Sequence, residues 1–116
     1  MITPQQVVSA LAVATRKGTA KWLRDEMTDG ALCVLPNEIV RLTIQRVAGN
    51  PSEIESMWLL LRGVQLLYLP GSDAGQILLA LAAEAEDDRE ALANAKRVVI
   101  DQVMKVLGER TEDLRS

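Results

Sequence analysis

Residues 57–69 are the segment that most restricts how this chain can fold. Ten of these thirteen residues are apolar, and on a helical wheel they leave almost no polar face. A capping-box pattern opens at Ser52 just before the segment, so the sequence predicts a helix over residues 53–69. A helix that is apolar on all sides must lie at the centre of a bundle or in an interface. Arg62 and Gln65 interrupt the run, which leaves no window long enough for a membrane span.

Local start and stop signals predict further helices. Thr3 is followed by Pro4 and, three residues on, by Gln6, which is a capping box with proline at the first helical position. Asp87 with Glu90 repeats this pattern before the last apolar stripe. The helices predicted in this way cover residues 4–17, 20–27, 73–85 and a last segment from Asp87 to Gly108.

Residues 31–47 fit two interpretations. Val40, Leu42 and Ile44 alternate with polar residues, which is strand periodicity, and Pro36 could lie in the turn of a hairpin. Pro36 also suits a first helical turn, and the same apolar residues fit one helical face. Helix is the preferred interpretation.

The predicted fold is therefore all-α, a compact bundle of five or six helices. It forms a single helical domain over residues 1–108, followed by a flexible polar tail over 109–116. The alternative is an α+β chain with a short β-hairpin in 31–47 and a winged-helix-like N-terminal half.

The composition argues against an enzyme. The 116 residues include no histidine and one cysteine, so histidine relays, imidazole ligands and cysteine metal clusters are excluded. Cys33 lies among apolar residues, and no cofactor motif occurs, so we predict no catalytic, cofactor-binding or metal-binding residues. The first residues lack the pattern of a signal peptide, and we expect a cytoplasmic protein that does not enter a membrane.

Charge is divided unevenly along the chain. Residues 1–50 hold six Lys or Arg against four Asp or Glu, a net charge of +2, whereas residues 51–116 hold seven against twelve, a net charge of −5. The basic side chains near Gly18 suggest helix-turn-helix geometry, with a hairpin as its wing. A solvated helix face explains them more simply. The candidate nucleic-acid contacts are Arg16, Lys17, Lys21, Arg24, Arg41 and Arg46.

The densest group of carboxylates lies between Glu84 and Glu90. It could dock on a basic partner surface, but a solvated helix N-terminus is the preferred interpretation, because carboxylates there complement the helix dipole. The spacing does not fit a calcium loop. The candidate docking residues are Glu84, Glu86, Asp87 and Asp88.

A chain of this length can enclose one helix that is apolar on all sides more easily than two. The surplus apolar surface therefore predicts a homodimer or a protein partner. The candidate interface residues are Trp58, Leu60, Leu67, Leu92, Val99 and Val103. The leading hypothesis is a small non-enzymatic regulatory or interaction protein, an inhibitor or adaptor of the kind a phage or mobile element carries. The alternative is a DNA-binding transcriptional regulator with an N-terminal helix-turn-helix-like region and C-terminal dimerisation helices.

Overall fold

The protein is α+β, and the prediction of an all-α bundle is wrong. The computed structural model describes the backbone of residues 2–27 and 29–115, and the side chains of these residues except 102, 103 and 106–115. Five strands lie between the first helix and two C-terminal helices. In chain order the elements are α1 (Pro4–Arg16), β1 (Lys21–Asp25), β2 (Gly30–Val34), β3 (Ile39–Val47), β4 (Asn50–Leu61), β5 (Val64–Tyr68), α2 (Asp73–Ala83) and α3 (Arg89–Arg115).

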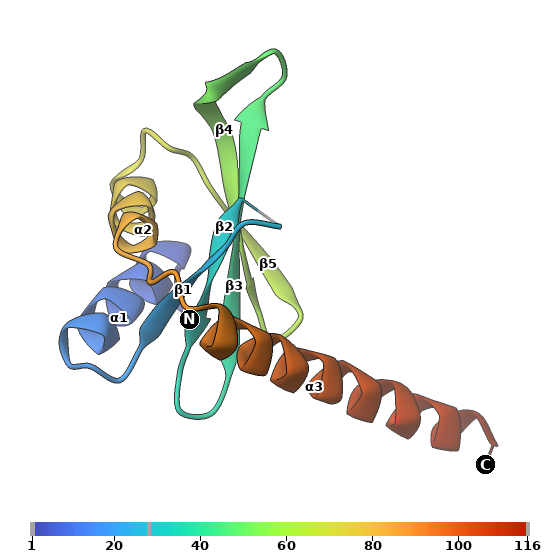
Figure 1. The fold of residues 1–116 in the computed structure, drawn as a ribbon. Helices are drawn as coiled ribbons and strands as arrows, with labels where there is room; N and C mark the ends of the chain where they lie inside the picture. The colour runs from blue at the N-terminus through green and yellow to red at the C-terminus, as the bar shows by residue number, and fades with distance from the viewer. Residues whose placement is uncertain (1, 28, 116) are drawn as a thin grey trace.

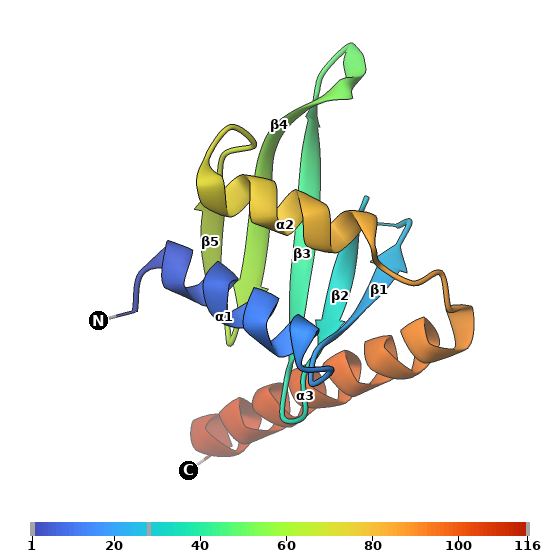
Figure 2. The same cartoon turned by 90° about the vertical axis from the view of Figure 1, so that its left-hand side faces the viewer.

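The five strands form one antiparallel sheet in the order β1-β2-β3-β4-β5, in which each strand pairs with its neighbours in sequence. Helices α1 and α2 lie side by side on one side of the sheet, and α3 lies on the other (Figures 1 and 2). We call these the α1/α2 side and the α3 side. Because neighbouring residues of a strand point to opposite sides, each strand contributes to both.

The main core lies on the α1/α2 side. Val8 and Leu11 of α1 and Leu78 of α2 pack on a continuous apolar surface made by all five strands. Tyr68 of β5 ties the start of α1 to this surface, since its hydroxyl donates a 2.7 Å hydrogen bond to the carbonyl of Pro4. The strand residues in this core are Trp22, Ala31, Cys33, Val40, Leu42, Met57, Leu59 and Tyr68.

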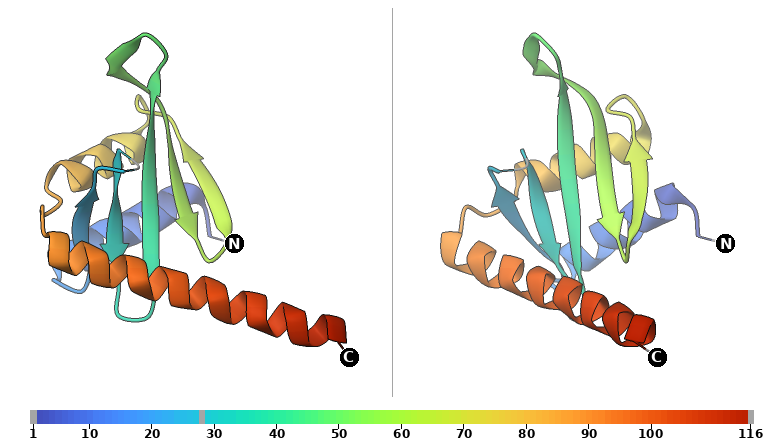
Figure 3. Two further views of the ribbon diagram at one scale, coloured as in Figure 1. Left: turned by 45° about the vertical axis from the view of Figure 1, so that its right-hand side comes forward. Right: turned by 90° about the vertical axis from the view of Figure 1, so that its right-hand side faces the viewer.

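A smaller core lies beneath the first turns of α3. Leu23 of β1, Leu32 of β2 and Ala95 of α3 are buried together, and Ile39 at the start of β3 packs against them. The 27 residues of α3 span about 40 Å, and the helix moves away from the sheet after these first contacts (Figures 1 and 3). The described helices include none that is long and apolar enough to cross a membrane.

The predicted helix over residues 53–69 is in fact the hairpin of β4 and β5. Its two-residue turn is Arg62-Gly63, with φ angles of +51° and +80°, which is the primed geometry that suits the twist of a hairpin. The apolar run fills both sides of these strands, so it shows no alternation. A pattern without alternation cannot distinguish a buried strand from a buried helix.

Two other segments correct or refine the predictions. The predicted helix over 20–27 is strand β1, whose Trp22 and Leu23 are buried on opposite sides of the sheet. In residues 31–47 the hairpin alternative is correct, because β2 and β3 pair there.

The other three helices are confirmed. Thr3 forms the complete capping box of α1 with Gln6, and Ser72 is the N-cap of α2. The last helix starts one residue later than expected, since the side chain of Asp88 accepts a hydrogen bond from the backbone N–H of Ala91. It continues past Gly108 to Arg115.

Candidate interaction surface

Three apolar side chains lie together on the α3 side of β4 and β5. Trp58 pairs with Leu67 across the two strands, and Leu60 lies two residues along β4 on the same side. Leu67 is 49% exposed, and Trp58 and Leu60 are half-buried. We call Trp58, Leu60 and Leu67 the α3-side patch. The sequence named these three residues as interface candidates, and the structure places them next to one another.

The patch is accessible because one helix cannot cover the whole sheet. Two helices cover the α1/α2 side, whereas the apolar contacts of α3 fall on β1, β2 and the start of β3. In Figure 3, α3 crosses the lower ends of the strands, so among the described residues no helix lies over the rest of β4 and β5 on the α3 side.

Polar residues of β3 border the patch. Arg41 pairs with Leu60 and Thr43 pairs with Trp58, so both side chains point to the α3 side. Arg41 is half-buried, and no carboxylate of the described side chains forms an ion pair with it. A cation beside an apolar patch favours a ligand that combines apolar and acidic groups.

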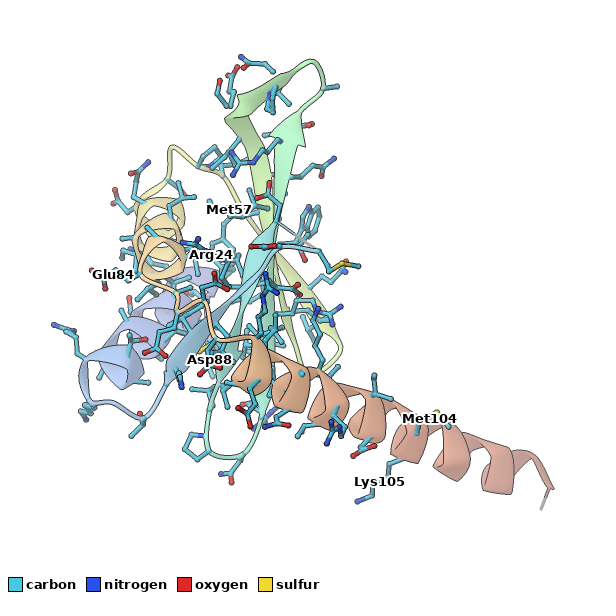
Figure 4. The ribbon with its side chains drawn as sticks, in the orientation of Figure 1. Arg24, Met57, Glu84, Asp88, Met104 and Lys105 are labelled. Atoms are coloured by element: carbon cyan, nitrogen blue, oxygen red, sulfur yellow. The ribbon has the colours of Figure 1, made fainter. Side chains whose placement is uncertain are left out.

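The part of α3 that leaves the sheet also exposes apolar side chains. Ile100 is 60% exposed and Met104 is 62% exposed, and Val98 of the same section is also exposed. Met104 and Lys105 project to different sides of the helix, well away from the strands (Figure 4). This section of α3 has apolar residues on more than one side, which is unusual for a helix surrounded by water.

The candidate nucleic-acid contacts do not gather on one helix. Arg16 and Lys17 end α1, whereas Lys21 and Arg24 lie on a strand and point to opposite sides of the sheet. Arg46 is held by an ion pair with Asp29 and donates a 3.1 Å hydrogen bond to the carbonyl of Pro51. The hydrogen bond to Asp29 raises the pKa of Arg46 further above its usual value.

The acidic residues have structural partners. Glu86 pairs with the outer edge of β1, because its N–H donates to the Trp22 carbonyl and its carbonyl accepts from the Arg24 N–H, each at 2.9 Å. Its carboxylate lies 3.3 Å from Lys21 Nζ, and that of Asp88 lies 3.9 Å from the same atom. The predicted basic and acidic sites therefore neutralise each other in part.

The other acidic residues cap or connect helices. Glu84 is the C-cap of α2, and Asp88 lies at the start of α3 (Figure 4). Asp87 lies in the segment that connects α2 with α3. Lys21 and Glu86 are 65 positions apart in the chain, so sequence spacing gave no signal of their pairing.

The helical members of the interface set lie elsewhere. Leu92 packs into the small core under α3, and Val99 is half-buried farther along the same helix. The side chain of Val103 lies outside the described residues. Arg41 was predicted from the sequence to contact nucleic acid. Its position beside Leu60 was not predicted, because it depends on the pairing of β3 with β4.

The single thiol is buried in the main core. Cys33 is 0% exposed, and burial raises the pKa of its thiol to about 12. A thiol held in its protonated form is a poor nucleophile and a poor metal ligand. Among the described residues, no group of three or more Cys, Asp or Glu is arranged to hold a metal ion.

No protein-family model matches the chain, and no curated protein or solved structure matches it. The arrangement of its own residues therefore carries the functional inference.

Proposed function

We propose that the chain is a non-enzymatic protein-interaction module, and that its α3-side patch binds an amphipathic helix of a partner protein. One observation carries this proposal. In a sheet with one solvated side, strand residues that point to water are normally polar. Here Trp58, Leu60 and Leu67 point to the side that α3 leaves open.

The shape of the open region favours a helix as the occupant. A helix packed beside α3 over β4 and β5 would give this side two helices, as on the α1/α2 side, and helix packing on a sheet buries an apolar face of the kind the patch presents. Its apolar face would bury the patch, since helices recognise partners through apolar residues at helical spacing. Acidic side chains at the edge of that face would meet Arg41.

Binding can be measured through the emission of Trp58. The chain has two tryptophans, and Trp22 is 4% exposed in the main core. In the Trp22→Phe variant, Trp58 is the remaining reporter, and burial beneath a partner helix shifts its emission to shorter wavelength. The probes are two synthetic amphipathic helical peptides with the same apolar stripe, one flanked by glutamate and the other by lysine. We expect the glutamate peptide to bind more tightly.

Two variants with the same change in charge test the surface. Leu60→Glu places a carboxylate in the patch and should weaken binding about thirtyfold, because that charge would lose its water beneath an apolar helix face. Val13→Glu adds the same charge on α1, where Val13 is 39% exposed, and should leave binding unchanged. Equal binding by the two variants, or no binding of either peptide to the parent protein, would contradict the proposal.

A further inference from the structure

The two outer edges of the sheet, at β1 and at β5, differ in what lies beside them. The outer edge of β1 is occupied by the Glu86 segment of the same chain, through the two 2.9 Å backbone hydrogen bonds. The outer edge of β5 has no strand beside it among the described residues. Natural proteins protect such edges with charges, prolines or bulges, because an open edge pairs with other chains. Residues 64–69 contain none of these, and Val64, Leu67 and Leu69 are 57%, 49% and 58% exposed.

We propose that the edge of β5 pairs antiparallel with β5 of a second copy, so that two five-stranded sheets join into one ten-stranded sheet. This joint uses backbone groups and does not rest on the function proposed for the α3-side patch. The pairing is isologous, because each copy uses the same strand, and the Glu86 segment occupies the outer edge of β1, so the pairing closes at two copies and does not propagate into a fibre.

The hairpin geometry fixes which backbone groups are available. Leu61 and Val64 flank the two-residue turn and hydrogen-bond each other, so Val64 and, by alternation, Leu66 and Tyr68 direct their backbone groups to β4. The N–H and C=O groups of Gln65 and Leu67 therefore face outward. A two-fold axis at Leu66 places Gln65 opposite the second copy's Leu67, and each such pair exchanges two hydrogen bonds.

Side chains and charges agree with this register. On the α1/α2 side, Val64 would meet the second copy's Tyr68, so apolar groups pair with apolar groups. The strand itself carries no charge, which removes like-charge repulsion from a self-pairing joint. Arg62 precedes it and Asp73 follows it. Antiparallel pairing brings each Arg62 to the same end as the second copy's Asp73, whereas parallel pairing would bring like charges together.

The test changes one backbone N–H and leaves the apolar patch intact. Gln65→Pro removes an outward N–H that β4 does not use, and proline is tolerated at such positions of an edge strand. Gln65→Ala is the matched control, because it truncates the side chain but keeps the N–H. Dissociation constants come from sedimentation equilibrium of the full-length chain, with circular dichroism to confirm that each variant is folded.

We expect Gln65→Pro to raise the dissociation constant about thirtyfold, since the dimer loses two interchain hydrogen bonds, and Gln65→Ala to change it less than about threefold. Hydrogen exchange gives a second readout, in which the amides of Gln65 and Leu67 become protected as the concentration rises while that of Leu66 does not change. A parent protein that stays monomeric at all concentrations overturns the inference. So does a dimer that resists Gln65→Pro but dissociates with Leu60→Glu, and that result would leave the α3-side patch as a protein-binding surface.

Discussion

Removing the positive charge of Lys96 should loosen α3 from the sheet. Asp25 is 1% exposed, and its Oδ1 lies 3.1 Å from Lys96 Nζ and accepts a 3.2 Å hydrogen bond from the N–H of Met27. Among the described residues its Oδ2 has no hydrogen-bond partner. Lys96 therefore supplies the positive charge that compensates a carboxylate buried on the side that α3 covers.

The magnitude follows from the exposure of the two partners. Removing one partner of a fully buried ion pair costs about 3–5 kcal/mol, whereas an exposed pair contributes about 0–1 kcal/mol. The Lys96 side chain is 33% exposed, so water screens part of the interaction. Lys96→Met keeps the apolar stem and removes the charge. We expect the free energy of unfolding to fall by about 2 kcal/mol, between these two limits.

Urea unfolding followed by circular dichroism measures this change. Lys105→Met is the control, since Lys105 is exposed on the part of α3 that leaves the sheet, and it should cost less than about 0.5 kcal/mol. With Asp25→Asn as the background, Lys96→Met should cost at least about 1 kcal/mol less than in the parent protein. Equal costs in both backgrounds would refute the view that this ion pair holds α3.

Two further predictions concern the sheet. Cys33 should resist alkylation at pH 8 in the folded protein and react quickly in urea. Because burial raises its pKa from 9.0 to about 12, the unfolded chain releases its proton first, and stability should fall as the pH rises from 9 to 12. Burial also raises the pKa of Tyr68, so a Cys33→Ala variant should show a smaller fall over this range rather than none. Gly30→Ala should destabilise the fold by about 3 kcal/mol in the same urea assay, because the new Cβ would lie 1.8 Å from the Leu42 carbonyl oxygen. Gly71→Ala is the control, since its Cβ meets open space, and it should have little effect on the free energy of unfolding. Similar losses from both substitutions would show that close packing at Gly30 is not the cause.

The helices that sequence analysis predicted correctly are those with local signals. Thr3 and Gln6 cap α1 through contacts three residues apart, and Ser72 caps α2 in a similar way. Such contacts form within one turn of chain, so the sequence contains all the information that they require. The same holds for the start of α3, where the prediction differs by one residue.

The error over residues 53–69 has a different origin. In most antiparallel sheets, polar residues on the solvated side produce an alternating pattern. In β4, Met57 and Leu59 point into the main core on the α1/α2 side, and they alternate with Trp58 and Leu60, which point to the α3 side and are also apolar. The residues of the proposed binding surface thus removed the signal that identifies a strand. The turn between β4 and β5 is Arg62-Gly63, and its glycine is a turn signal in the sequence. The turn was nevertheless hard to predict, because Arg62 adopts a positive φ angle, which non-glycine residues rarely do.

By itself the sequence determined which residues are apolar, where three helices begin, and that no histidine or cysteine cluster exists. Tertiary structure decided which residues meet. The pairing of β3, β4 and β5 brings Arg41, Leu60 and Trp58 to one surface, and the return of the chain after α2 brings Glu86 to Lys21. These contacts depend on strand register and on which helix covers which side of the sheet. Both are set by the burial of the whole core, because a shift of one residue would move every side chain of a strand to the opposite side.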